Sequence, residues 1–499
     1  MKRLFILLTV MASLVSCVDL LQKPQSTQTP ETIVLNEQVL DGLANGLYKD
    51  WWGENFGFNC RIASLTLAAD DVITGDVAKP RLLADDQMRV PVDNVDVQIL
   101  WKYLYKTIFT ANNLISLIED NTTLDKSVTD RYLGEAKFMR ALMYFYIVRL
   151  WGDAPAITDP QGAADINGKP NMPRTPVKQI YEKIIVPDAK EAERLLPQLS
   201  RDMGNQAPTT WAAKVLLSDV YLNMAGWPLK ETSYYADAAE KAEDVIDNGP
   251  HDLLSEYKSL WLKSESRNRK EHIFALNHSL SYLPSQYAQS YLGYEENGWS
   301  DYCADPVFFA NYPDDKRKEF NFVTKTIDYK SKTEISWGTF GTGAPYIRKY
   351  RNFGGCGEYG IEGETSPNSQ LAEGITPIYR YADVLLFYAE ASFKATGSSS
   401  EKAYDCLNDV RDRAFGDMNH RLSNLAPADF EKAVFDEFGW ENAFEFKRWF
   451  QLVRTEKVDE MLAKNPDANA RVNVGKQNYL FPLPARQVEL RGWQNNPGY

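Results

Sequence analysis

Two stretches far apart in the chain share one helical sequence pattern, and this pattern constrains the fold most strongly. The first is AAKVLLSDVYLNMAG followed by YYADAAEKAEDVI, over residues 212–226 and 234–246. The second is YADVLLFYAEASFKATG followed by EKAYDCLNDV, over residues 381–397 and 401–410. In both, a helix rich in leucine and small residues meets a turn, and then a helix with alanines at its packing face. Because small residues let two helices approach closely, each stretch predicts a tight helical pair.

A helical pair of this kind cannot bury its apolar face alone, so further helices must stack on it. The pattern resembles the helix–turn–helix unit of tetratricopeptide repeats in degenerate form. A generic helical bundle is the alternative. Either way, we predict a mostly α fold.

Helix start and stop signals support this scaffold. Asn36 is a plausible cap for the helix EQVLDGLANGLYKDWW, and helical periodicity returns from about Val97. Ser127 and Asp130 resemble a capping box at the start of the next helix. Pro187 is expected to kink or restart a later one.

Residues 277–376 have a different sequence pattern. Glycine, proline and polar residues break the helical periodicity, short β-like runs appear, and aromatic residues are frequent. An excursion of this length inside a helical scaffold is usually a functional elaboration. We predict one domain over residues 36–499, with a scaffold of tetratricopeptide-like repeats over 36–276 and 377–499. Residues 277–376 form a large, irregular, loop-rich insert that carries short β-strands.

The first residues have the layout of an export signal. Lys2 and Arg3 precede an apolar run that is shorter than the roughly 20 residues of a membrane span. The run ends in LVSC at Cys17, the order of a bacterial lipobox. We predict a signal peptide over residues 1–16, a lipidated Cys17 and a flexible tether over 17–35, which places the protein on a membrane surface. An ordinary signal peptide that ends near a cysteine is the alternative.

Composition and motifs exclude several functions. A net charge of −13 argues against nucleic-acid binding. Sequences of the GxSxG, HExxH, Walker A and EF-hand types are absent, and the four histidines lack metal-ligand spacing. GCGEYG, from Gly355, matches GxGxxG but lacks the flanking strand and helix of a dinucleotide site. We therefore predict a protein that is not an enzyme and holds neither cofactor nor metal; whether calcium assists binding stays open.

Paired carboxylates and cysteines give weaker signals. Asp70 and Asp71 could serve glycosidase acid–base chemistry only if two carboxylates converged across a cleft, and a solvated or capping role is the stronger interpretation. Cys303 and Cys356 are either paired or free buried thiols.

Several segments together resemble the SusD/RagB family, in the family's order and over nearly the whole chain. They are SCVDLL, EAKFMRALMYFYIVRLWGDAPAIT, AAKVLLSDVYLNMAG, PIYRYADVLLFYAEA, LNDVRDRA, ENAFEFKRWFQLVR and FPLPARQVEL with the terminal NNPGY. The resemblance implies a helical outer-membrane lipoprotein, facing the cell exterior, that binds nutrients, mostly glycans. It also implies that the protein caps a TonB-dependent transporter of the SusC type.

The resemblance has departures and leaves the roles of some residues open. Such families usually have glycine at the position of Phe446, aspartate at that of Gln451 and an ERR-like run near Asp436. Six polar residues match family motifs, and we expect them to fix helix register through buried ion pairs and hydrogen bonds rather than to bind ligand. They are Arg140, Tyr144, Asp153, Asp383, Arg411 and Arg448.

Ligand-binding residues are expected in the aromatic-rich insert. An aromatic ring buries the apolar face of a sugar, while polar side chains bond its hydroxyl groups. Trp299, Trp337, Tyr294 and Tyr302 are the first candidates, because each lies in polar sequence where core packing is not expected. Two weaker candidates, in loops early in the chain, are Trp52 and Arg81. Core packing or contact with the transporter is the alternative for each.

The nature of the ligand stays open in the sequence. From Asp314 to Arg351 there are nine Lys or Arg and five Asp or Glu, which could favour a uronic or sulfated glycan or form a solvated loop surface. The first hypothesis is a surface glycan-binding lipoprotein that delivers oligosaccharides to the transporter. The alternatives are a peptide-capturing lipoprotein of the RagB type and, less favoured, a glycoside hydrolase.

Overall fold

The structure is a computed structural model. It describes residues 35–499 apart from 54–56, 77, 121–122, 161, 163–171, 202–206, 263, 266, 286, 352–371, 464–470 and 472–473. The predicted signal peptide, Cys17 and nearly all of the tether lie outside the described residues, as do Cys356 and the GCGEYG motif. Cys303 is a free, buried cysteine.

The fold is mostly helical, as predicted. The scaffold helices before the insert are α2 (Glu37–Trp52), α3 (Gly57–Leu65), α4 (Pro80–Asp86), α5 (Val95–Glu119), α6 (Lys126–Trp151), α8 (Val177–Ile180), α9 (Val186–Leu195), α10 (Thr210–Ala225) and α11 (Tyr234–Asn248). Those after it are α15 (Tyr381–Thr396), α16 (Glu401–Phe415), α17 (Pro427–Glu441), α18 (Arg448–Arg454), α19 (Val458–Ala463) and α20 (Ala485–Arg491). Within the described residues, none of the helices has the length and apolarity to cross a membrane.

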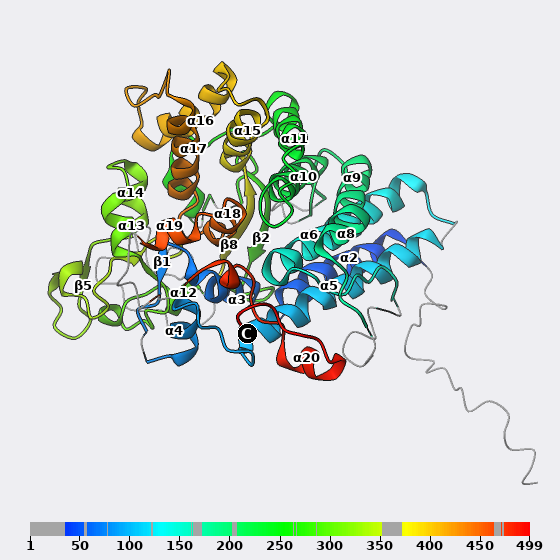
Figure 1. Cartoon of the computed structure of the whole chain (residues 1–499), viewed down its shortest axis with the longest axis horizontal. Coiled ribbons are helices and arrows are strands. Elements are labelled where there is room, and N and C mark those ends of the chain that lie inside the picture. Colours follow the sequence, from blue (N-terminus) through cyan, green and yellow to red (C-terminus); the bar gives the residue numbers. More distant parts are fainter. Residues whose placement is uncertain are drawn as a thin grey trace, which may run out of the picture.

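The long helices stack in sequence order. α2 packs on α5, α5 on α6, α6 on α9, α9 on α10 and α10 on α11. α11 then packs on α15, which packs on α16 and α17. Figure 1 shows this array running from α2 and α5 through α10 and α11 to α15 and α16. Neighbour-on-neighbour stacking is the packing of a repeat scaffold, and it buries one continuous apolar core.

The two stretches with the shared sequence pattern form the helical pairs α10–α11 and α15–α16, as predicted. The pairs are separated by the insert in sequence but lie side by side, because α11 packs directly on α15. Alanines at the contact allow this close approach: Ala238 and Ala242 on α11 and Ala389 on α15 are fully buried.

Local predictions had mixed outcomes. The Asn36 cap is confirmed, since its side chain accepts a hydrogen bond of 2.9 Å from the Val39 backbone N–H. The predicted Ser127 cap is wrong: Asp125 caps α6, and Ser127 lies inside the helix. The restart predicted at Pro187 is confirmed, because a new α-helix, α9, begins at Val186 with Pro187 in its first positions. This helix comes directly after a π-helical turn over Tyr181–Ile185 that widens the ladder of hydrogen bonds.

The insert leaves and rejoins the scaffold through one pair of strands. β2 (His272–His278) and β8 (Gly374–Arg380) are antiparallel, with His278 opposite Gly374 and His272 opposite Arg380. Both strands are fully buried, and they lie at the centre of the molecule in Figure 1. The predicted boundaries 277 and 376 fall inside this pair, so the two ends of the insert are fastened together.

The body of the insert is built from short elements, as predicted. They are η3 (Tyr257–Trp261), just before the insert, α12 (Tyr287–Ser290), η4 (Tyr294–Glu296), β3 (Cys303–Ala304), α13 (Pro306–Asn311), α14 (Lys316–Asn321), β4 (Phe322–Val323), β5 (Lys325–Ile327), β6 (Glu334–Ser336), η5 (Trp337–Thr339) and β7 (Tyr346–Ile347). A four-stranded sheet has the order β1-β3-β7-β4, where β1 is Val72–Ile73, and β5 pairs with β6. Because β1 comes from the N-terminal part, this sheet ties the insert to the segment that leads into α4.

A buried cluster of charges joins the insert to the scaffold. The guanidinium of Arg380 donates to Glu271 at 2.9 Å, to Glu441 at 2.8 Å and to Glu445 at 2.7 Å. Arg413 donates to Glu271 at 2.8 Å and to Glu441 at 2.7 Å. All five residues are at most 7 % exposed. The cluster brings together β8, α16 and α17, so it fixes where the insert emerges.

Phe446 stands where the family resemblance leads us to expect glycine, and its backbone has a conformation that glycine adopts more readily. Its φ is +63°, in the left-handed region that costs a residue with a side chain roughly 1–2 kcal/mol. The phenyl ring lies parallel to that of Tyr350, with centroids 6.0 Å apart. Ring packing therefore offsets a strained backbone at this position.

Candidate functional site

An aromatic ring and a cation meet where the insert lies beside the start of α4. Lys79 Nζ lies over the Trp299 ring, 4.9 Å from its centroid. The same ammonium pairs with Asp301 and, at 3.2 Å, with Asp76. Trp299 stays partly exposed. The cation–π contact, worth about 0.5–1 kcal/mol at such a site, holds the ring in place without drawing it into the core.

Tyr294 borders the same group of charges. It is 39 % exposed, and its backbone N–H donates to Ser300 Oγ at 2.9 Å. Partial burial, and then a hydrogen bond to the Asp76 carboxylate, raise the pKa of the Tyr294 phenol. Tyr294 and Trp299 therefore present two partly exposed rings around Asp76, Lys79 and Asp301; we call these five residues the aromatic face.

The loop that carries the aromatic face has a tightly specified backbone. Asn297 adopts a left-handed φ of +62°, which asparagine tolerates better than most residues. A Cβ on Gly298 would lie 2.2 Å from the Leu292 carbonyl oxygen, so only glycine fits there. The Trp299 N–H then donates to the Gln289 carbonyl at 3.0 Å, and Ser290 Oγ donates to Asp301 at 2.9 Å. The sequence YEENGWSD thus fixes the ring by local geometry.

Helix α4 positions the cationic side of the aromatic face. Lys79 precedes α4, and Pro80 begins the helix at a position where proline is tolerated. Asp86, at the end of α4, accepts hydrogen bonds from Thr74 N at 2.9 Å and from Arg471 Nε at 3.0 Å. These contacts anchor a seven-residue helix that could not be stable alone.

Asp85 in α4 makes the stability of this region depend on pH. It is fully buried, and burial raises the pKa of its carboxyl to about 8, although Arg81 and Asn94 act in the opposite direction. Because the folded pKa exceeds the unfolded value, the group stabilises the fold below about pH 4, and this contribution is lost as the pH rises toward 8.

We therefore expect Asp85→Asn to be more stable than the wild type by about 1–2 kcal/mol at pH 8.5, because the amide imitates the neutral acid. At pH 4 the two proteins should melt alike. Thermal unfolding monitored by circular dichroism at both pH values measures the difference. A constant difference between pH 4 and pH 8.5 would show that Asp85 does not titrate in this range.

The structure does not bring all predicted site residues to the aromatic face. Tyr302 was expected outside the core, and this is wrong: it is 2 % exposed, and its ring lies 5.0 Å from that of Tyr291. Its hydroxyl bonds to Ser64 at 3.0 Å. Trp52 is the last residue of α2 rather than a loop residue, is 3 % exposed and donates to the Pro284 carbonyl at 3.2 Å. Neither ring has a face free for a ligand.

Arg81 and Trp337 are partly exposed but lie in other surroundings. Arg81 belongs to α4, not to a loop, and its guanidinium pairs with Asp96 and donates to Ser64 at 3.2 Å. Trp337 opens η5, and its ring lies edge-on to Phe309 with centroids 5.7 Å apart. Lys79, Asp76 and Asp301 were not predicted from the sequence, because nothing in it shows that the residues before α4 lie beside the insert.

The six polar residues of the family motifs have structural partners, as expected. Arg140 forms a paired contact with Asp188, at 2.6 and 2.9 Å. Arg448 does the same with Asp70, at 2.7 and 2.9 Å. Tyr144 donates a hydrogen bond to the Ile157 carbonyl, and Arg411 donates one to Glu437. The carboxylate of Asp153 accepts from the Val177 N–H. The carboxylate of Asp383 accepts from the Arg380 N–H and from Lys447.

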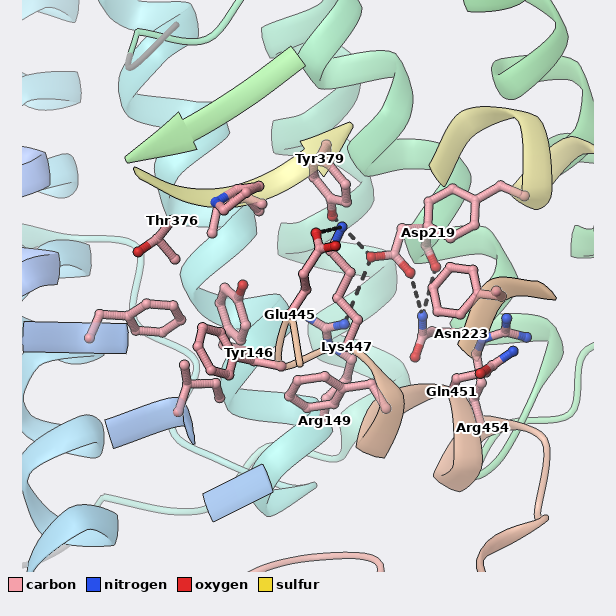
Figure 2. A pocket seen from close by; sticks show the side chains of 18 residues that line it. Tyr146, Arg149, Asp219, Asn223, Thr376, Tyr379, Glu445, Lys447, Gln451 and Arg454 are labelled. Carbon is pink, nitrogen blue, oxygen red and sulfur yellow. Dashed lines mark hydrogen bonds and ion pairs between the residues drawn. The ribbon is translucent and has the colours of Figure 1, made fainter. Parts of the chain in front are cut away.

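A polar cavity lies among the scaffold helices, beneath β2 and β8 (Figure 2). Asp219 lines the cavity and accepts hydrogen bonds from Tyr379 at 3.0 Å and from Asn223 at 2.9 Å, and Arg149 lies 3.8 Å from its carboxylate. The cavity measures about 50 Å³. That is room for one or two water molecules and well below the roughly 300 Å³ of small ligand pockets. Its side chains therefore hold the scaffold together.

The acidic residues considered for catalysis, Asp70 and Asp71, have structural partners. Within the part of the chain that the structure describes, no cluster of His, Cys, Asp and Glu could hold a metal ion. Asp70 holds Arg448, and Asp71 accepts from the Phe444 N–H at 2.8 Å. Burial and the neighbouring Asp70 raise the pKa of Asp71 to about 6. Both carboxylates fix the C-terminal segment.

The positive segment 314–351 is partly internal. Arg317, Lys349 and Arg351 are at most 1 % exposed. Arg317 pairs with Asp315 at 2.8 Å, and Lys349 with Glu445 at 2.8 Å. Three of the nine basic residues are therefore buried and have structural roles. This weakens the argument from the sequence that the segment binds an acidic glycan.

Comparison with known proteins covers nearly the whole chain. The model of the SusD family matches residues 286–499, and a second family model, described as starch-binding associating with outer membrane, matches residues 19–222. SusD-like protein P2 of Formosa agariphila is 29 % identical over 99 % of this chain and 98 % of its own.

Solved structures agree with this match. A SusD superfamily protein from Parabacteroides distasonis has a TM-score of 0.81 and 26 % identity, covering 94 % of this chain and all of its own. Surface glycan-binding protein A from Bacteroides thetaiotaomicron, in complex with laminarihexaose, has a TM-score of 0.74 and 17 % identity over 92 % of this chain and 99 % of its own. The helical array, the fastened insert and these matches show that the chain belongs to the SusD/RagB family.

Proposed function

We propose that this protein binds neutral glycans at the aromatic face and passes them to a transporter without chemical change. The observation that carries the proposal is the partly exposed Trp299 ring, held on one side by Lys79 and bordered by Tyr294. A pyranose would stack its apolar face on the indole, opposite the ammonium. Asp76, Lys79 and Asp301 would bond its hydroxyl groups.

Relatives support a carbohydrate ligand. Proteins of the same fold bind laminarin or laminarihexaose, both neutral glucans. In this chain the carboxylates of Asp76 and Asp301 outnumber the single ammonium of Lys79 at the aromatic face. The local charge therefore favours a neutral sugar over a uronic or sulfated one.

Anchoring and delivery complete the proposal. Acylated Cys17 would hold the protein on the outer surface of the outer membrane, and a SusC-type barrel would accept the glycan. The related family model describes proteins that associate with the outer membrane. Binding at an open face, with few rings, favours the fast release that delivery needs.

A glycan array beside a peptide library tests the proposed ligand class. We expect retention of neutral oligosaccharides and none of peptides; the opposite result would favour a peptide-capturing protein of the RagB type. Incubation with each retained polysaccharide, followed by chromatography, should yield no new products. Released oligosaccharides would instead indicate a glycoside hydrolase.

Lipidation of Cys17 is a separate prediction. In membranes from cells that make the full chain, the mature protein should begin at Cys17 and carry acyl chains. It should also co-purify with a large β-barrel in mild detergent. Mass spectrometry of the N-terminal peptide measures the first property, and an unmodified N-terminus downstream of Cys17 would contradict the anchoring.

A further inference from the structure

A second hollow lies between helices α13 and α17, and its lining includes none of the five residues of the aromatic face. Its volume is about 440 Å³, within the roughly 300–1,000 Å³ range of small-molecule sites. It is also far larger than the water-sized cavity around Asp219. Its residues come from four helices, α13, α17, α18 and α19, and from the segment before β1. We call it the α13–α17 groove.

Helical spacing builds the two walls of this groove. Lys432, Asp436 and Trp440 are four residues apart on α17 and therefore lie along one face of that helix. Val307 and Asn311, also four apart, form the facing wall on α13. Lys432, Asp436 and Trp440 on α17 thus face Val307 and Asn311 on α13 across the groove.

The indole of Trp440 is held in place before any ligand arrives. The side chain is half-buried, and its ring lies 6.4 Å from that of Tyr312. The Tyr312 hydroxyl donates to the Trp440 carbonyl at 2.5 Å. Phe308, 9 % exposed, also lines the hollow. Two aromatic residues with little freedom supply an apolar surface that a ligand can cover at low entropic cost.

The polar groups of the groove favour an uncharged ligand. Arg448 is neutralised by Asp70 through two hydrogen bonds, and Lys432 pairs with Asp436 four residues later. The remaining acid is Asp305, whose carboxylate caps α13 at 2.7 and 3.0 Å. With each cation matched by a carboxylate, an anionic ligand would lack a counter-charge. Hydroxyl groups, by contrast, can bond to Asn311, Asp436 and Lys432.

We propose that the α13–α17 groove is a second saccharide subsite, which binds one or two residues of a neutral glycan with Trp440 as its stacking ring. The proposal rests on the proposed function, since it assumes that neutral glycans reach this protein. Two separate weak sites would let one molecule hold a long polysaccharide at two points, which raises its apparent affinity without a tight individual site.

The experiment is calorimetric titration with laminarihexaose, cellohexaose, maltohexaose and xylohexaose. The proteins are the wild type, Trp299→Ala, Trp440→Ala and the double variant, with Trp493→Ala as control, because Trp493 is a half-buried tryptophan outside the groove. We expect two sites in the wild type and in the control, one in each single variant and none in the double variant. Within the Trp299→Ala background, Trp440→Ala should weaken binding at least tenfold.

Two outcomes overturn the inference in distinguishable ways. In the first, the wild type binds a hexasaccharide, and Trp440→Ala binds as many hexasaccharide molecules per protein with the same affinity. The groove is then not a saccharide site, and the proposed function stands. If the wild type binds none of the four, the proposed function falls and the second subsite falls with it. Trp440→Phe, which keeps an aromatic ring against Tyr312, replaces the alanine variant if the latter does not fold; it should retain part of the groove affinity.

Discussion

Replacing Arg380 by methionine should lower the free energy of unfolding by about 3–5 kcal/mol at pH 7, because removing one partner of a buried ion cluster leaves uncompensated charges. Arg380 is fully buried and is bonded to Glu271, Glu441 and Glu445. Burial alone would raise the pKa of Glu441, but the charges of Arg413 and Arg380 hold it down at about 2. Without Arg380, these buried carboxylates would have to take up protons or move into contact with solvent.

The sign of the pH dependence follows from the lowered pKa. A carboxyl whose folded pKa lies below its unfolded value stabilises the fold above about pH 4.5, and this contribution disappears as the pH falls through 2. The difference between wild type and Arg380→Met should therefore narrow as the pH falls from about 4.5 toward 2. Urea unfolding at pH 7 and at pH 3 measures this difference.

Arg421→Met is the matched control for Arg380→Met. Arg421 also contacts several carboxylates, among them Asp409 at 3.2 Å, but its side chain is 32 % exposed. Such surface pairs are worth about 0–1 kcal/mol, so this variant should be nearly as stable as the wild type. Equal stability of the two variants would show that the buried cluster does not fasten the insert to the scaffold.

Replacing Trp299 by alanine should weaken glycan binding by about 1–3 kcal/mol, or roughly 5- to 150-fold, because a stacked sugar loses the apolar area that the indole covers. The melting temperature should barely move, since Trp299 is partly exposed and lies outside the core of the scaffold. Calorimetric titration beside a melting curve measures both properties. Trp337→Ala tests whether the ring of η5, which packs against Phe309, also takes part.

A tryptophan of the scaffold should behave in the opposite way. Trp449 is 1 % exposed within the main core. Trp449→Phe should melt earlier because of the cavity that it leaves, and its folded fraction should bind normally. If Trp299→Ala melts early while its folded fraction binds as well as the wild type, the aromatic face is a structural element and the glycan site lies elsewhere.

The scaffold was predictable because its signals are local. The alanine-rich pairs that became α10–α11 and α15–α16 carry their packing faces in their own periodicity, and Asn36 caps the helix that it precedes. The predicted limits of the insert, residues 277 and 376, lie within the paired strands β2 and β8. Such features depend on residues within a few positions of one another.

The site was predicted only in part, because it depends on contacts between distant residues. Trp299 and Tyr294 were identified by their polar surroundings, but Lys79 reaches Asp301 across 222 positions. Tyr302 lies in the same polar sequence, yet the strand that follows carries it inward to Ser64 on α3. The buried cluster was missed for the same reason: Arg380 and Glu271 are 109 residues apart, and nothing in either segment shows that they meet.

The position of the bound sugar is the most direct test. A crystal structure of the protein with a neutral oligosaccharide that it retains should show a pyranose ring lying against the exposed side of the Trp299 indole, about 4 Å away. Its hydroxyl groups should bond to Asp76, Lys79 or Asp301. A complex in which the sugar touches neither Trp299 nor Tyr294 would contradict the assignment of the aromatic face as the glycan site.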